Sequence, residues 1–188
     1  MRLPSNIDDI TNVADFNERV NDARRLQLAR QITKSDKSET ELKVVLEKLP
    51  EFIPANYDYN KNVEKAENMG LLQAYAAFRN GGEWDYKQIE KGSGIYEDFG
   101  NFNYGLMTDK MYGGVGLPRS FGDMAAGLAQ IRAGTSPLGK NPSLGDFILD
   151  KYYGDDPKDA VQIRKGREIN DLDVNSLNND SDSKTRIE

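Results

Sequence analysis

The sequence predicts a mainly α-helical protein: a single helical domain with a central region rich in glycine and aromatic residues. Three observations support this fold class. Apolar residues recur every three or four positions over long stretches, capping signals precede several of those stretches, and all 17 glycines lie at or beyond Gly70. A chain of 188 residues is typical of one compact unit with appended segments.

The first 69 residues contain no glycine, and we expect them to form a helical N-terminal segment. A first helix is predicted over about residues 13–32, because its apolar side chains fall on one face of a helix. Ser38 and Glu41 have the spacing of a capping box that begins a second helix, which Pro50 ends.

The middle of the chain is predicted to change from helix to loop. A third helix is expected over about residues 60–77, ended by the glycine pair at 81–82. Residues 81–117 contain so many glycines that we expect loop with short extended pieces. Within that loop Phe102 and Tyr104 alternate with asparagines, which leaves room for a short β-hairpin.

The last third of the chain is predicted to form three further helices. One spans about residues 118–133 and is closed by Gly134, and a short one runs over about residues 143–152. The last begins at Asp156, with Pro157 at its first helical position.

We therefore expect three parts. Residues 1–69 form the helical N-terminal segment, residues 70–170 form a catalytic body, and residues 171–188 form a flexible acidic tail. The tail is rich in Asn, Asp and Ser and has few apolar residues to bury.

Composition excludes several kinds of chemistry. The chain has no Cys and no His, so a thiolate nucleophile, a zinc-thiolate site and an imidazole base are excluded. The 25 Lys and Arg against 31 Asp and Glu leave a net charge of −6, which lacks the basic footprint of a nucleic-acid binder. Catalysis is therefore expected to depend on carboxylates, Lys, Tyr, hydroxyls or amides.

The densest polar stretch is residues 96–105. Glu97 and Asp98 stand among aromatic rings, an environment that raises the pKa of a carboxyl group and suits it to act as a general acid. Asn101, Asn103 and Tyr104 are then candidates for binding a polar substrate. The alternative is structural: the rings anchor the core and the amides satisfy buried backbone.

A second stretch, residues 81–87, holds the only Trp of the chain. In an extended segment Asp85 and Lys87 point the same way, so Lys87 keeps Asp85 ionised or polarises a substrate oxygen. An exposed Trp84 ring is a platform for a sugar or a base. The alternative is a buried Trp beside a solvated ion pair of little energetic weight.

The third stretch, residues 153–159, carries three carboxylates in five positions. Their spacing is not that of an EF-hand loop, and helix capping accounts for Asp156 and Asp159. Asp155 is left without a capping role and becomes a catalytic candidate. We expect no bound metal and no cofactor.

Four segments, taken in order, resemble a known family. They read GGEWDYK (81–87), YEDFGNFNYG (96–105), AGLAQIRAGTS (126–136) and YGDDPKDAVQIRKG (153–166). Over about residues 78–166 the chain resembles the polymorphic toxin type 44 domain, also called bacterial toxin 44. The resemblance implies a secreted effector in competition between bacteria, carried by a secretion system and neutralised by a cognate immunity protein. It groups these residues into one site: Asp85, Lys87, Glu97, Asp98, Asn101, Asn103, Tyr104, Asp155 and Asp156.

For an acidic enzyme without His or Cys, glycoside hydrolysis needs the fewest additions: one carboxylic acid, one carboxylate and aromatic platforms. The leading hypothesis is therefore a peptidoglycan-degrading toxin that acts in the periplasm of the target cell. A ribonuclease toxin acting in the target cytoplasm is the first alternative, and a non-catalytic binding module is the second. The sequence shows no membrane span and no secretory signal, so we expect export by another route.

Overall fold

The computed structural model describes residues 13–33, 38–90, 93–115, 118 and 120–184. Within these ranges the chain forms eight α-helices and a short 3-10 helix, and no β-strand. The prediction of a mainly α fold is confirmed. The elements in chain order are α1 (Val13–Thr33), α2 (Glu39–Lys48), α3 (Tyr59–Glu67), α4 (Leu71–Phe78), η2 (Tyr86–Gln88), α5 (Glu97–Val115), α6 (Ser120–Ala133), α7 (Leu144–Leu149) and α8 (Pro157–Lys184).

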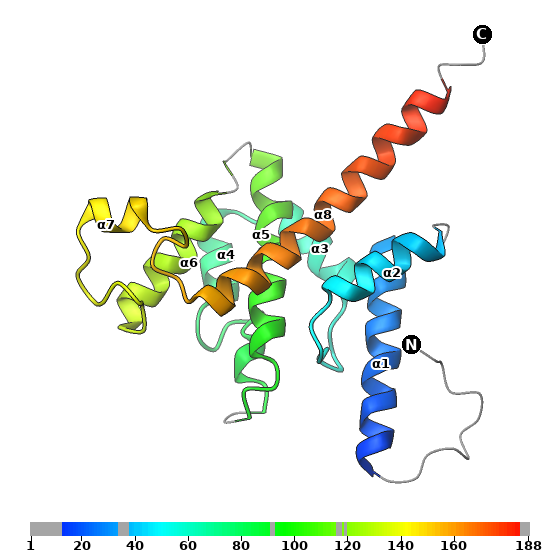
Figure 1. Cartoon of the computed structure of the whole chain (residues 1–188), viewed down its shortest axis with the longest axis horizontal. Coiled ribbons are helices and arrows are strands. Elements are labelled where there is room, and N and C mark those ends of the chain that lie inside the picture. The colour runs from blue at the N-terminus through cyan, green and yellow to red at the C-terminus, as the bar shows by residue number, and fades with distance from the viewer. Residues whose placement is uncertain (1–12, 34–37, 91–92, 116–117, 119, 185–188) are drawn as a thin grey trace.

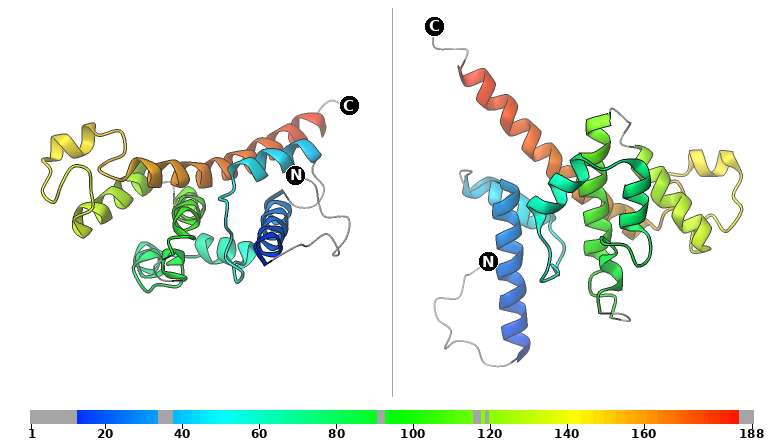
Figure 2. Two further views of the ribbon diagram at one scale, coloured as in Figure 1. Left: turned by 60° about the horizontal axis from the view of Figure 1, so that its bottom comes forward. Right: turned by 180° about the vertical axis from the view of Figure 1, so that it is seen from behind.

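Helix α5 lies near the centre of the molecule, and α8 crosses it and continues past α2 (Figure 1). Both views of Figure 2 place α6 and α7 on one side of α5 and α1 and α2 on the other. Although α8 has 28 residues, neither it nor any other described helix is long and apolar enough to cross a membrane.

The core is built around α5. Its side chains Phe99, Phe102, Leu106 and Met107 are completely buried. One cluster of buried residues includes these four together with side chains from α1, α2, α3 and α8. The core therefore extends across residue 70, where the sequence predicts a domain boundary, and the three-part division stays a prediction.

Two glycines allow the backbones of α5 and α8 to touch where the helices cross. A Cβ atom on Gly105 would lie 1.9 Å from the carbonyl oxygen of Ile163, and one on Gly166 would lie 2.1 Å from that of Phe102. Any side chain at either position would force the helices apart. The crossing sets where the first turn of α8 lies relative to the rest of the molecule.

This crossing corrects the prediction of a central loop. Residues 97–115 are helical, so the alternation at Phe102 and Tyr104 does not form a hairpin. Gly105 serves close helix packing rather than a turn, because it faces the backbone of α8. The loop character is limited to the described residues between α4 and α5, where η2 is the only helical turn.

Two other helix boundaries differ from the prediction. The expected third helix is two helices, α3 and α4, separated at Gly70, whose N–H donates to Gln73 Oε1 at 2.8 Å and so begins α4. Helix α8 continues to Lys184, into the stretch that the sequence predicts to be a flexible tail. Its backbone is therefore helical beyond residue 170, and the side chain of Leu172 packs against the core. The mobility of the expected tail stays a prediction.

Truncation can locate the true start of the dispensable segment. Removing residues 173–188 is expected to leave the melting temperature nearly unchanged, because this segment contains few apolar residues. Removing residues 171–188 also deletes Leu172, and burying an aliphatic side chain contributes about 1–2 kcal/mol. Thermal unfolding of the two truncated proteins tests this difference. Equal melting temperatures would show that Leu172 adds nothing to the core.

Candidate functional site

A cluster of polar side chains lies where the first turn of α8 meets η2 and α6. Lys87 Nζ is 3.3 Å from Asp159 Oδ2, and Gln130 Nε2 donates to the same oxygen at 3.1 Å. Asp155 is only 4% exposed and interacts electrostatically with both Asp159 and Lys87. We call Lys87, Gln130, Asp155 and Asp159 the acidic centre.

The start of α8 separates the roles of its three carboxylates. Asp156 Oδ1 accepts a hydrogen bond from Lys158 N at 2.8 Å, which confirms the prediction that Asp156 caps the helix. Asp155 Oδ1 accepts from Asp156 N at 3.0 Å. Asp159 lies in the first turn and directs its carboxylate to Lys87 and Gln130. Capping therefore occupies Asp156 and leaves Asp155 and Asp159 for the acidic centre.

The turn that carries Asp155 is pressed against α6. A Cβ atom on Gly127 would lie 1.8 Å from the carbonyl oxygen of Tyr153, so only glycine allows this contact. The hydroxyl of Ser136, just beyond α6, donates to Gly154 O at 2.6 Å. These two contacts bring Asp155 to Gln130, whose side chain also hydrogen-bonds to Asp155.

The two carboxyl groups of the acidic centre experience opposite electrostatic environments. Burial raises the pKa of Asp155 to about 6, and the neighbouring charge of Asp159 acts in the same direction. Asp159 has the cation of Lys87 and the amide of Gln130 beside it, and the helix N-terminus favours negative charge there. Asp155 therefore holds a proton more readily than a carboxyl group in water does.

The pKa of Asp155 predicts how stability depends on pH. The folded protein holds the Asp155 proton more tightly than an unfolded chain, in which the pKa is 3.8. The stabilising contribution of this group is therefore complete below about pH 4 and is lost as pH rises through about 6. The expected loss is on the order of 2 kcal/mol.

Urea unfolding at pH 4 and pH 7 measures this effect if the wild type is compared with Asp155→Asn. All other carboxylates titrate in both proteins, so their contributions cancel in the comparison. The variant is expected to gain stability relative to the wild type at pH 7 but not at pH 4. An identical pH dependence of the two proteins would show that Asp155 titrates normally.

Tyr104 forms part of the wall beside the acidic centre. Its hydroxyl donates to Gly122 O at 3.0 Å, and burial raises its pKa well above the usual value of 10. Next to it Arg167 Nη1 pairs with Asp123 Oδ2 at 2.7 Å. Tyr104 thus remains protonated, and its hydroxyl contacts the backbone of α6 rather than an open surface.

Three predicted substrate-binding residues prove to be core residues, which corrects that assignment. Trp84 is 2% exposed, and its indole N–H donates to Asn62 Oδ1 at 3.1 Å. Asn101 is buried, and Asn103 is completely buried with its Oδ1 accepting from the hydroxyl of Tyr57 at 3.0 Å. The aromatic neighbours that suggested a substrate surface instead enclose these side chains.

The predicted pairing of Asp85 with Lys87 also needs correction. Asp85 Oδ2 accepts from Gly81 N at 2.7 Å and closes a turn, whereas Lys87 extends to α8. The two side chains do not alternate as in a strand, because Lys87 lies in the 3-10 helix η2.

Glu97 and Asp98 lie in the first turn of α5, and both are exposed. Asp98 Oδ2 accepts a hydrogen bond from Gln162 Nε2 at 3.0 Å. Gln162 lies one turn along α8 from Asp159. Neither carboxyl is surrounded by the apolar environment that the sequence pattern predicts. Of the predicted catalytic residues, Lys87 and Asp155 therefore meet in the acidic centre.

Sequence reasoning missed Asp159 and Gln130 as members of the site. Asp159 had a sufficient explanation in helix capping, and Gln130 lies in a different element with no charged neighbour in sequence. The segment AGLAQIRAGTS, which contains Gln130, does belong to the family resemblance. That segment was the one signal in the sequence that pointed to α6.

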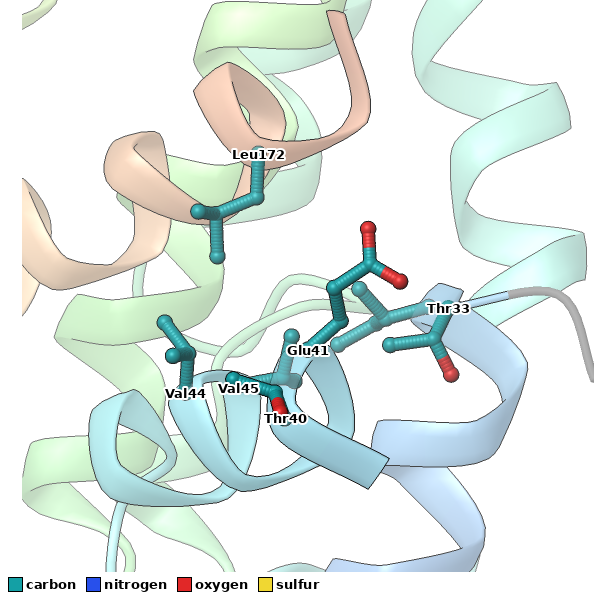
Figure 3. A pocket seen from close by; sticks show the side chains of 7 residues that line it. Thr33, Thr40, Glu41, Val44, Val45 and Leu172 are labelled. Atoms are coloured by element: carbon teal, nitrogen blue, oxygen red, sulfur yellow. The ribbon is translucent and has the colours of Figure 1, made fainter. Parts of the chain in front are cut away.

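An apolar hollow lies elsewhere, between the end of α1, α2 and α8 (Figure 3). Val44, Val45 and Leu172 point into it, and Glu41 is the ionisable residue among the described side chains that line it. The carboxylate of Glu41 takes part in the capping box of α2. Leu172 is about 20 Å along α8 from Asp159, so the hollow is separate from the acidic centre.

Comparisons with protein families, with curated proteins and with solved structures give no match for this chain. Among the described residues, no group of three or more acidic side chains is arranged to hold a metal ion.

Proposed function

We propose that this chain is an antibacterial effector that hydrolyses glycosidic bonds in peptidoglycan, with the acidic centre as its catalytic site. The observation that carries the proposal is the unequal pair of carboxyls. Asp155, whose pKa is raised to about 6, lies beside Asp159, which Lys87 and Gln130 contact. Glycosidases use such a pair, one carboxylic acid and one carboxylate, at the bond that is cleaved.

In this mechanism Asp155 donates its proton to the glycosidic oxygen as the bond to the sugar carbon breaks. The carboxylate of Asp159 stabilises the positive charge that develops on the sugar ring, and water then bonds to the sugar carbon and returns a proton to Asp155. Lys87 Nζ pairs with the carboxylate of Asp159 at 3.3 Å. The side chain of Lys87 is 36% exposed, so the acidic centre reaches the protein surface there.

The biological setting of the proposal comes from the resemblance to the polymorphic toxin type 44 domain. In that setting a secretion-system carrier delivers the protein to the target cell. It acts in the periplasm of the target cell, and a cognate immunity protein neutralises it in the producing cell.

A ribonuclease toxin is the second candidate, and one observation favours it. An acidic centre with a cation, Lys87, and a carboxyl of pKa about 6 suits proton transfer from a ribose 2′-hydroxyl. This activity would be exerted in the target cytoplasm.

Expression in bacteria with and without a periplasmic leader separates these functions. Lysis with the leader only, together with cleaved glycan strands in mass spectra of the cell wall, is the expected result. Asp159→Asn is expected to abolish lysis. The matched control is Asp146→Asn, because Asp146 caps α7 through Ser143 and is outside the acidic centre.

Other outcomes contradict the proposal. Growth arrest and degraded RNA without the leader would support the ribonuclease. If neither form is toxic, the chain is a non-catalytic binding module.

A further inference from the structure

The end of α6 brings Thr135 back beside Gln130. Thr135 N donates to Gln130 O at 3.1 Å, and Gly134 N donates to Ile131 O at 3.1 Å. Gly134 has a φ of +76°, which favours glycine. This pattern is the Schellman motif, in which the chain reverses over the last turn of a helix. The residue after the glycine therefore lies next to the side chain that begins that turn.

Thr135 uses this position to hold the side-chain amide of Gln130. Its hydroxyl donates to Gln130 Oε1. In a carboxamide the oxygen accepts hydrogen bonds and the nitrogen donates them. A hydroxyl that donates to Oε1 therefore orients Nε2 away from Thr135 and toward the acidic centre. Nε2 then donates to Asp159 Oδ2 at 3.1 Å, and the amide also hydrogen-bonds to Asp155.

We propose that Gln130 and Thr135 form a positioning pair that determines which carboxyl of the acidic centre carries the proton. The inference rests on the proposed function for its catalytic meaning, but its physical content can be measured separately. A reversed amide would present Oε1 to two carboxyl groups. An oxygen there repels both carboxylates and favours their protonated forms.

Gln130 is the carboxamide among the described polar groups that face Asp155. The others are Asp159 from α8, Lys87 from η2 and the phenol of Tyr104 from α5. Substitution of any of these three changes a charge or the wall of the site. Thr135 is exposed and contacts the acidic centre only through Gln130, so its hydroxyl is the least disruptive place to intervene.

The test compares Thr135→Val, which lacks the hydroxyl but keeps the shape, with Thr135→Ser, which keeps the hydroxyl. Carboxyl ¹³C resonances of the folded, full-length protein give the titration midpoint of Asp155. In Thr135→Val we expect this midpoint to rise by about half a pH unit or more, and in Thr135→Ser to stay near that of the wild type. Gln130→Met, which removes the amide, is expected to raise it as well.

The activity profile provides a second measurement. If the wild type cleaves peptidoglycan, the pH optimum of Thr135→Val should move upward by the same amount and that of Thr135→Ser should not. An unchanged midpoint in both Thr135→Val and Gln130→Met overturns the positioning role even when the enzyme is active. A shifted midpoint in a protein without hydrolytic activity instead supports the positioning pair and contradicts the proposed function.

Discussion

Replacing Asp155 by Asn is expected to lower hydrolytic activity by about 10²–10⁴-fold, the usual contribution of a general acid. The amide has nearly the shape of the carboxyl and retains an oxygen that accepts from Asp156 N, as Asp155 Oδ1 does. The fold should therefore persist, and the circular dichroism spectrum should match that of the wild type. Release of soluble glycan fragments from purified peptidoglycan measures the loss.

The controls for this prediction are Asp98→Asn and Glu97→Gln. Both side chains are exposed at the start of α5, and the amide at position 98 can still accept from Gln162 Nε2. Each variant is expected to retain nearly full activity. If one of them is inactive while Asp155→Asn is active, the carboxyl pair suggested by the sequence pattern is correct and the acidic centre is wrong.

Replacing Gly105 by Ala is expected to lower the free energy of unfolding by about 3 kcal/mol or more. The new methyl group would lie 1.9 Å from the carbonyl oxygen of Ile163, which is backbone and cannot move aside as a side chain can. Overpacking of a core usually costs about 1–3 kcal/mol, and a clash with backbone lies at the upper end or beyond. For a chain of 188 residues the melting temperature should fall by about 10 °C.

Gly145→Ala is the matched control for this substitution. Gly145 also lies within a helix, but the atom nearest to a Cβ there is Ser143 Oγ at 3.7 Å, an ordinary contact. Because alanine favours helix over glycine by about 1 kcal/mol, this variant should be as stable as the wild type or slightly more so. Similar melting temperatures for the two alanine variants would show that α5 and α8 do not touch at Gly105.

Most helices could be predicted from the sequence where local signals decide them. The capping box of Ser38 and Glu41 begins α2 as expected, and Asp156 caps α8. The sequence pattern failed to predict α5. A glycine that ends a helix cannot be distinguished in sequence from a glycine that lets the backbone of another helix pack closely. Only the position of α8 distinguishes these cases, and that position depends on contacts far apart in the chain.

The candidate site was predicted in part for the same reason. The sequence pattern selected Asp155 because capping left it unexplained, and it selected Lys87 for its charge. The partners of these residues come from the start of α8 and the end of α6, so proximity in sequence could not reveal them. Asn103 and Trp84 misled the prediction, because side chains that hydrogen-bond inside a core, as these do to Tyr57 and Asn62, have the composition of a binding surface.

The crossing of α5 and α8 also has a consequence for the order of folding. Lys87 and Asp159 are separated by 72 positions in the chain, and the amide of Asn170 reaches Leu106 O across 64 positions. Closing loops of this length costs conformational entropy before any contact compensates for it, which makes such contacts slow to form. The helix that supplies Asp159 follows the other described helices in the chain and is therefore synthesised after them. A nascent chain that has not yet docked α8 thus holds Lys87 and Gln130 without their carboxylate partner, so the acidic centre forms only once the start of α8 has packed against η2 and α6.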